Sequence, residues 1–411
     1  MAGSHEVSMF VTGPRFSSNY MGMTIRYEEA IERAQSIVPI AQRNIALAED
    51  MRRMPEENIK AILESGLMPL MRPKMFGGYE GDWMTQIDCV SEVARICGST
   101  GWCMTFFIQH QYFLSLFPLE AQRFVYDRQP DPTLLTSFNQ TGQVKEVTGG
   151  YEIGGRWHFA SGGDYCQWGI VGGVTRNQDG SVNKRLNFLL RSEQFRIDRV
   201  WDSMGLKGSG SNDVIVEPTF VPANFVYDHD DALIGRAPGQ LALDGVLYRS
   251  PLILNSGFAV MTPMHGIARG AYEAFVELTA GRGARPLGAK PSDRVDVQIA
   301  IGQSKAEIDL AYLITEKLVA TIFEGKKVTR VDAVRQRRDM MMLKQMLLSA
   351  INRLFDLSGA HGLLGNHAIQ RHWRDLHAIS HHAQWAAPAI QIAGRDALGL
   401  PPLPSDTYPL D

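Results

Sequence analysis

The chain has 411 residues, a formal net charge of -3, 45% hydrophobic residues and 21% charged residues. This length and composition are typical of a well-folded globular protein of two or three domains, and the charge excludes a broad basic surface for nucleic acid or an anionic membrane. No apolar run is long enough to span a membrane, and residues 1–24 lack the layout of a signal peptide. We therefore expect a cytoplasmic protein with a flexible leader over residues 1–24.

The predicted elements change type twice along the chain. Residues 25–135 carry apolar side chains at spacings of three and four, which predicts an N-terminal helical domain. Residues 136–245 contain alternating or β-rich runs between glycine-rich turns, which predicts a central β domain. Residues 246–411 return to long helical patterns that are typical of a helical bundle. The expected fold class is α+β.

Two common classes of site are not indicated by the sequence. The elements have no alternating βαβ rhythm, and the glycines of residues 205–210 have the wrong spacing for a dinucleotide fingerprint. The four cysteines, at positions 89, 97, 103 and 166, show no C-x-x-C spacing. We interpret these cysteines as buried free thiols in a reducing compartment.

Six of the eleven histidines lie between residues 361 and 382, where the stretch RDLHAISHH ends at His382. Imidazole is a common zinc ligand, but no H-E-x-x-H pattern occurs and the irregular intervals define no single face, so we expect no metal. A helix turns by about 100° per residue, so His381 and His382 cannot point into one cleft. Asp375 and His382 would share one helix face, and His377 and His381 another. Surface or interface roles for these histidines stay open.

Two further segments carry candidate residues with competing interpretations. Ser161 in the stretch WHFASG is either a turn residue or a hydroxyl that contacts a planar heterocycle. His110 lies in the apolar run after GSTGW and is either a satisfied core histidine or a catalytic one. Its neighbours Trp102 and Phe106 are either plain core or the wall of an aromatic-substrate pocket.

The order of these segments resembles that of a known family. The chain contains, in sequence, GSTGW, GGYEIGGRWHFASG, WDSMGLKGSGSNDV and IQRHWRDLHAISHH. Over about residues 25–400 it resembles the acyl-CoA dehydrogenase fold, with a central β-barrel or sandwich and a C-terminal four-helix bundle. More closely, it is similar to the oxygenase components of two-component flavin-dependent monooxygenases. These include p-hydroxyphenylacetate hydroxylase, the steroid-catabolic phenol hydroxylases and dibenzothiophene monooxygenase.

The resemblance implies an oxygenase that receives reduced FMN or FAD (FMNH2 or FADH2) from a separate NAD(P)H-dependent flavin reductase. With O2 it would form a C4a-hydroperoxyflavin and oxygenate a small aromatic or heteroaromatic substrate, and the protein would be a homotetramer. Dehydrogenases of this fold need a glutamate base, whereas residues 251–266 and the stretch RDLHAISHHAQWAAPAIQ after its aspartate contain no acid. A dehydrogenase or oxidase with an unrecognised base, or a non-catalytic member of the fold, is the alternative.

The same resemblance implies roles for individual residues. Ser161 would hydrogen-bond the flavin N5 region, and His382 would lie near the flavin C4a. His110 would face the substrate, as an orienter or as a base for a phenolic hydroxyl, in a pocket with Trp102 and Phe106. The further flavin contacts that it implies are Trp157, Phe159, Lys207, Ser209, Ser211, Arg282 and Arg285. The two arginines are candidates for the flavin phosphate.

Overall fold

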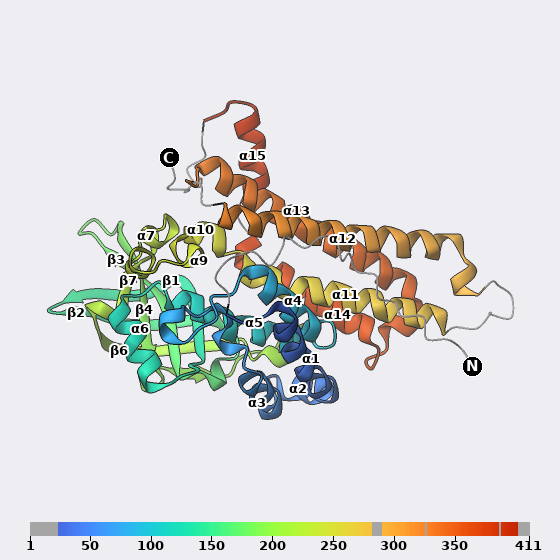
Figure 1. Cartoon of the computed structure of the whole chain (residues 1–411), viewed down its shortest axis with the longest axis horizontal. Helices are drawn as coiled ribbons and strands as arrows, with labels where there is room; N and C mark the ends of the chain where they lie inside the picture. The colour runs from blue at the N-terminus through green and yellow to red at the C-terminus, as the bar shows by residue number, and fades with distance from the viewer. Residues whose placement is uncertain (1–23, 282–289, 325–326, 386–387, 402–411) are drawn as a thin grey trace.

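The computed structural model describes residues 24–281, 290–324, 327–385 and 388–401 (Figure 1). Helices come first, one β-sheet follows, and long helices complete the chain, so the predicted α+β class is confirmed. Arg282 and Arg285 lie outside the described residues. Within those residues, no helix combines the length and the apolar character that crossing a bilayer requires.

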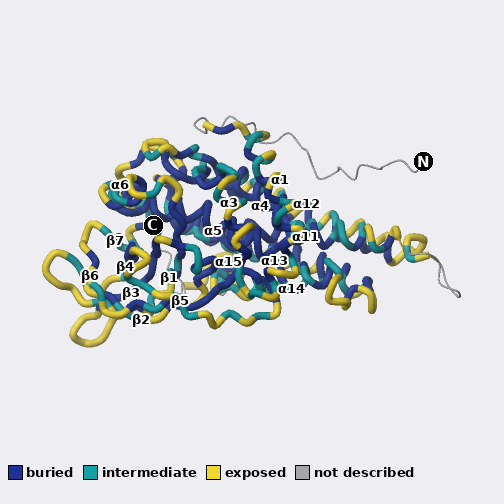
Figure 2. Tube along the Cα trace, turned by 90° about the horizontal axis from the view of Figure 1, so that it is seen from below, coloured by how far each residue is buried: buried dark blue, intermediate teal, exposed yellow. Residues whose placement is uncertain are grey.

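The N-terminal helices include one fully buried member. They are α1 (Tyr27–Arg43), α2 (Ile45–Met51), α3 (Glu56–Glu64), α4 (Trp83–Ala94), α5 (Gly98–Leu114) and α6 (Leu119–Arg128). All the residues of α5 are buried, and Figure 2 shows this helix in the middle of the molecule. A helix without an exposed face belongs in the core of a protein, and α5 contacts α4, the sheet and the C-terminal helices. The side chains of α5 are therefore held from all sides.

The central segment forms one mixed sheet of seven strands. They are β1 (Leu134–Val147), β2 (Gly150–Ala160), β3 (Trp168–Arg176), β4 (Val182–Arg191), β5 (Arg196–Asp198), β6 (Asn212–Pro222) and β7 (Val226–Asp228). Their spatial order is β5-β6-β2-β1-β3-β4-β7. Only β1 and β3 pair in parallel, and the other neighbours are antiparallel. The antiparallel pair of β2 and β6 shifts register near the end of β2, between Trp157 and Ala160.

The C-terminal helices include the four long members of the predicted bundle. They are α7 (His229–Leu233), α8 (Pro238–Ala242), α9 (Val246–Arg249), α10 (Leu252–Asn255), α11 (Phe258–Ala280), α12 (Val295–Phe323), α13 (Arg330–Ser358), α14 (Ala368–Ser380) and α15 (Ala389–Ala397). Helices α12 and α13 pack along each other, and α11 packs on α13, α14 and α4. The short helices α7 and α8 lie inside the segment predicted as the β domain, so that segment contains both types of structure.

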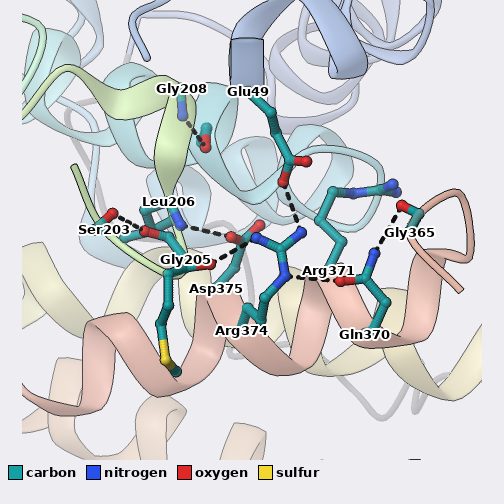
Figure 3. A network of polar contacts seen from close by, with 12 residues as sticks. Glu49, Ser203, Gly205, Leu206, Gly208, Gly365, Gln370, Arg371, Arg374 and Asp375 are labelled. Carbon is teal, nitrogen blue, oxygen red and sulfur yellow. Dashed lines mark hydrogen bonds and ion pairs between the residues drawn. The ribbon is translucent and has the colours of Figure 1, made fainter. Parts of the chain in front are cut away.

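Two consecutive residues of α14 hold the loop that leads from β5 to β6 (Figure 3). The Asp375 carboxylate accepts a hydrogen bond of 2.6 Å from the backbone N–H of Leu206. The Arg374 guanidinium donates to the carbonyl of Met204 at 2.6 Å and to the carboxylate of Glu49 at 2.8 Å. These three contacts join the bundle, the sheet and α2 at one point.

Two glycines make room for this contact. A Cβ atom on Gly205 would lie 2.0 Å from the carbonyl oxygen of Arg374, and one on Gly98 would lie 2.5 Å from Oδ2 of Asp375. Both distances are too short for any side chain. Gly98 opens the GSTGW motif, so the GSTGW, GLKGSGS and RD segments of the sequence all meet at Asp375.

The Asp375 carboxyl is buried, and this burial raises its pKa from 3.8 to about 6, although the N–H of Leu206 and the cations of Arg371 and Arg374 lower it. We expect Asp375→Asn to change how stability depends on pH. Because the folded-state pKa lies above the unfolded one, ionising Asp375 costs stability as the pH rises from about 4 to 6. Over that range the thermal midpoint of the variant should gain on that of the wild type, by the equivalent of about 3 kcal/mol. The prediction would be contradicted if the midpoint of the variant differed from that of the wild type by the same amount at about pH 4 and at about pH 7.

Candidate functional site

One face of α5 carries a row of rings. Trp102, Phe106 and His110 are spaced by four residues, which places them one above another on a helix. The ring centroids of Trp102 and Phe106 are 4.8 Å apart, and those of Phe106 and His110 are 5.3 Å apart. The ring of His382 lies 6.1 Å from that of Trp102. The three predicted pocket residues and the predicted flavin-side histidine thus form one continuous row.

A line of hydroxyls begins at the Trp102 indole. Its Nε1–H donates to Ser161 Oγ at 2.8 Å, and Oγ atoms 2.7 Å apart link Ser161 to Ser211 and Ser211 to Ser209. Ser209 is fully buried, and among the described residues Ser211 is the partner of its hydroxyl, so Ser209 donates to Ser211 and Ser211 donates to Ser161. Ser161 then accepts two hydrogen bonds, and its own proton is directed away from both donors.

Backbone hydrogen bonds hold the two segments that carry these serines. The N–H of Gly162 donates to the carbonyl of Ser209 at 2.9 Å. The N–H of Gly208 donates to the hydroxyl of Ser99, in the GSTGW motif, at 3.2 Å. The hydrogen bond from Leu206 to Asp375 holds the same loop. These backbone contacts fix the segments that carry Ser161, Ser209 and Ser211 even without the hydrogen bonds between the three hydroxyls.

A bulge at the end of β2 separates two aromatic side chains that were predicted to contact flavin. Phe159 has a φ of 68°, in the left-handed region that bulky residues rarely adopt, and its side chain is 64% exposed. Trp157 is fully buried, and its indole donates to the carbonyl of Gly172 at 2.7 Å. Trp157 and Ser209 therefore have no exposed surface in this structure, and their predicted direct flavin contacts stay predictions. Trp157 belongs to the sheet core, and Ser209 supports Ser211.

The turn after α14 presents His382 to the site. Helix α14 ends at Ser380, so the predicted helix face shared by Asp375 and His382 is wrong, and His382 reaches Trp102 from the turn. Its Nδ1 accepts from the backbone N–H of Gln384 at 3.1 Å, which leaves the proton on Nε2. Burial lowers the pKa of His382 to about 4, so the ring is neutral near pH 7.

The neighbouring histidines of the RDLHAISHH stretch face elsewhere. His381 is exposed, and its Nδ1 bonds the carbonyl of His377 at 2.9 Å. The Nε2 of His377 bonds Asn352 on α13 at 2.8 Å. Among the residues that the structure describes, no group of three or more His, Cys, Asp or Glu side chains is placed to hold a metal ion.

His110 is held at both ring nitrogens. Its Nδ1 contacts the carbonyl oxygen of Leu134, which can only accept, so Nδ1 carries the proton. Its Nε2 therefore accepts from the hydroxyl of Thr136 at 3.0 Å. Burial lowers the pKa of His110 to about 4, so this imidazole is also neutral near pH 7. His110 and His382 carry their protons on different nitrogens.

Lys207 supplies a positive charge beside the hydroxyl line. It begins the short turn Lys207–Ser209 and is half-buried. No partner of its ammonium is found within the described ranges. An anionic group of a ligand can therefore pair with this cation.

The arrangement fits a flat heteroaromatic ring with a polar edge and an anionic tail. Phe159 offers an exposed aromatic face, Ser161 a directed proton, and Lys207 a cation. The left-handed backbone of Phe159 stores strain of about 1–3 kcal/mol, as residues at ligand sites often do. A flavin has this shape, because its ring is planar, its N5 edge takes hydrogen bonds and its phosphate is anionic.

Two residues of this region were missed by reasoning from the sequence. Thr136 bonds His110 across 26 positions, and Asp375, expected only as a helix-face residue, bonds Leu206 across 169 positions. Neither pair has a short-range spacing that a motif search would find. The only local signal for Thr136 is a polar residue that follows two leucines at the start of a strand.

The comparisons with known proteins agree with this geometry. Residues 28–123 match the family described as acyl-CoA dehydrogenase, N-terminal domain, and residues 258–386 match its C-terminal domain. The flavin-dependent monooxygenase oxygenase subunit HsaA of Rhodococcus jostii (strain RHA1) is 33% identical over 377 residues, which cover 90% of this chain and 98% of the relative. The FADH(2)-dependent resorcinol hydroxylase oxygenase component of Rhizobium sp. (strain MTP-10005) is 29% identical, covering 90% and 94%.

A solved structure supports the same conclusion. The crystal structure of 3-HSA hydroxylase from Rhodococcus sp. RHA1 matches with a TM-score of 0.86 and 32% sequence identity, over 93% of this chain and 100% of that one. The likeness therefore extends over nearly the whole of both chains and confirms the resemblance seen in the motifs. The chain belongs to the oxygenase subunits of flavin-dependent monooxygenases, which are built on the acyl-CoA dehydrogenase fold.

Proposed function

We propose that this protein is the oxygenase component of a two-component monooxygenase. It takes FMNH2 or FADH2 from a separate NAD(P)H-dependent reductase and uses O2 to oxygenate a small aromatic or heteroaromatic substrate. Reduced flavin, when bound, supplies the electrons that activate O2. Its four cysteines are free and buried, which supports the cytoplasm as its compartment.

One observation carries the proposal: Ser161, at the head of the ring row on α5, accepts hydrogen bonds from Trp102 and Ser211 and so keeps its own proton for a ligand. Ser161 and Phe159 hold the flavin ring, with Lys207 toward its phosphate. His382, whose ring lies 6.1 Å from that of Trp102, offers an Nε2–H. The buried rings of Trp102 and Phe106 exclude water from the reaction.

His110 orients the substrate at the other end of the row. Its Nε2 accepts one hydrogen bond, from Thr136, and a phenolic or other O–H of a substrate can take that place. Neighbouring rings give the substrate an apolar wall, since Phe113 and Phe138 continue the row with a centroid distance of 4.8 Å. A planar substrate with one hydroxyl or ring N–H suits this surface.

The dehydrogenase alternative lacks its base at both places where the fold supplies one. Residues 251–266 contain no acid, and the first acid after Asp375 is Asp396. Asp396 pairs with Arg330 on α13 at 3.0 Å. Asp375 itself is buried and accepts from the backbone N–H of Leu206, so we assign it to holding the loop between β5 and β6.

The proposal is tested by mixing the protein and anaerobically reduced FMN with oxygenated buffer. We expect a delay before the absorbance of oxidised flavin returns, because the site protects the oxygenated state from water. Ser161→Ala should shorten the delay on the order of tenfold, since one hydrogen bond is lost. Reoxidation as fast as that of free FMN in the wild type would contradict the proposal. Anaerobic bleaching of bound oxidised flavin by substrate would indicate a dehydrogenase, and absence of flavin binding a non-catalytic protein.

The role of His382 beside the flavin can be tested with the adjacent His381 as a matched control. His382→Ala should slow the reaction of the bound reduced flavin with O2 on the order of tenfold, because the Nε2–H donor is removed. His381→Ala should leave the rate unchanged, since His381 is exposed and bonds only its own segment. The rate is measured by stopped flow at several O2 concentrations. Equal effects of the two substitutions would remove His382 from the proposed site.

We also propose that the protein assembles as a homotetramer. Helix α12 buries one face in the bundle, and a second, exposed stripe runs along it at spacings of three and four. The stripe consists of Ile299, Gly302, Ala306, Leu310 and Leu313. Small residues in its middle and aliphatic residues at its ends suit close contact with a helix of another copy.

Charges in this stripe should break the assembly. Leu310→Glu combined with Leu313→Glu should lower the mass in solution from four times 45.7 kDa to a smaller species, because an interface that buried these charges would lose its apolar contact. Leu241→Glu, at an exposed leucine outside α12, is the control and should leave the mass unchanged. Light scattering after gel filtration measures both. An unchanged mass of the double variant would contradict the assignment of this surface.

A further inference from the structure

The turn after α14 determines which nitrogen of His382 carries the proton. The backbone N–H of Gln384 donates to His382 Nδ1 at 3.1 Å, and the backbone N–H of Trp385 donates to the His382 carbonyl at 2.9 Å. A backbone N–H cannot become an acceptor, so protonating Nδ1 would break the first of these bonds and leave two donors facing each other. The geometry of the turn therefore opposes the imidazolium form.

A residue of another helix holds this turn in place. Arg337 on α13 donates to the side-chain oxygen of Gln384 at 2.8 Å and to the hydroxyl of Ser256, before α11, at 3.0 Å. The indole of Trp385 donates to the carbonyl of Ile379 at 2.9 Å, which fastens the far end of the turn to α14. Arg337 therefore fixes the side chain of Gln384, and the backbone N–H of Gln384 is bonded to Nδ1 of His382.

The charged groups around the turn also disfavour a cation at His382. Helix α13 contributes Arg337 and Lys344, whose ammonium lies 5.3 Å from the centre of the Trp385 ring. Helix α5 contains no Asp, Glu, Lys or Arg, and His110 is its one titratable imidazole. On the same segment, His377 and His381 bond Asn352 and their own helix, and the Asp375 carboxylate bonds Leu206. None of these contacts places a carboxylate beside the His382 ring.

We propose that Arg337 and Gln384 are positioning residues that keep His382 a neutral Nε2–H donor throughout the pH range in which the enzyme works. This inference rests on the proposed function, in which His382 serves the flavin. His382 then donates a hydrogen bond to an acceptor atom of the bound flavin or of the activated oxygen at every such pH. It does not act as a group that titrates between an acid and a base form.

The proposal is tested without flavin, by the fluorescence of the full chain as a function of pH. A protonated imidazole quenches an adjacent indole, and the His382 ring lies 6.1 Å from that of Trp102. Each protein is measured with and without an added His382→Ala substitution, so that the difference isolates the signal of His382. In the wild type we expect no His382-dependent step between about pH 5 and 8, because burial lowers the pKa of His382 to about 4 and the contact with the N–H of Gln384 opposes protonation of Nδ1.

Arg337→Met and Gln384→Ala release the turn and let water reach the ring. Each should produce a quenching step whose midpoint moves up by about two pH units, toward the ordinary histidine value of about 6.5, which is on the order of a 100-fold gain in proton affinity. Arg338→Met is the matched control, because its guanidinium pairs with Asp339 at 2.6 Å and not with the turn. It should show no step.

Several outcomes would overturn the inference. Absence of a step in both Arg337→Met and Gln384→Ala would show that the turn does not set the state of His382, and a step of the same size in Arg338→Met would show a general loosening of α13. If Arg337→Met does not fold, Gln384→Ala decides alone. Failure of the proposed function is a separate result, seen as absence of reduced FMN binding to the wild type, and it does not affect this titration.

Discussion

The hydrogen bond from the Trp102 indole to the Ser161 hydroxyl joins helix α5 to the end of strand β2, and the site is built around it. Because every residue of α5 is buried, packing fixes the position of Trp102. A buried indole N–H without an acceptor would cost about 1–3 kcal/mol of stability. This cost favours the position of Ser161 in which its hydroxyl accepts from Trp102. Ser211 fills the second lone pair of Ser161, and one proton remains for a ligand.

Burial keeps the two histidines of the site uncharged, and backbone contacts determine which ring nitrogen of each histidine carries the proton. It lowers the pKa of His110 and of His382 to about 4, because a low-dielectric environment disfavours the charged imidazole. The carbonyl of Leu134 keeps the proton of His110 on Nδ1, whereas the N–H of Gln384 keeps that of His382 on Nε2. The ring row on α5 therefore has an acceptor nitrogen at one end and a donor nitrogen at the other.

Reasoning from the sequence found the parts of the site but not their geometry. Local motifs identified Ser161, His110 and His382, and the structure brings all three to the row of α5, although their roles stay predictions. Alternation along a strand would place Trp157 and Phe159 on one face, but the bulge in β2 turns Phe159 outward and leaves Trp157 in the core. Such a bulge depends on the pairing with β6, which no local pattern in β2 reveals.

The end of helix α14 and the contacts between residues far apart in the chain could not be predicted from the sequence. The periodicity of the RDLHAISHH stretch continues past Ser380, yet the helix ends there, because the turn gains the contacts of Gln384 and Trp385. The fold class and the order of the elements were predictable, since they follow from periodicities that persist over many residues. Thr136 and Asp375 were not, because each acts through a partner that only the folded chain brings near.

The same constraints explain how this scaffold supports oxygenation without a carboxylate base. Asp375 is buried and accepts a hydrogen bond from the backbone N–H of Leu206, so its role is to hold the loop between β5 and β6. An imidazole with a pKa of about 4, such as that of His110, is too weak a base to remove a proton from carbon. It can still accept a hydrogen bond from a hydroxyl and so fix the orientation of an aromatic ring. The chemistry proposed here therefore relies on orientation and on exclusion of water, which a buried and neutral site provides.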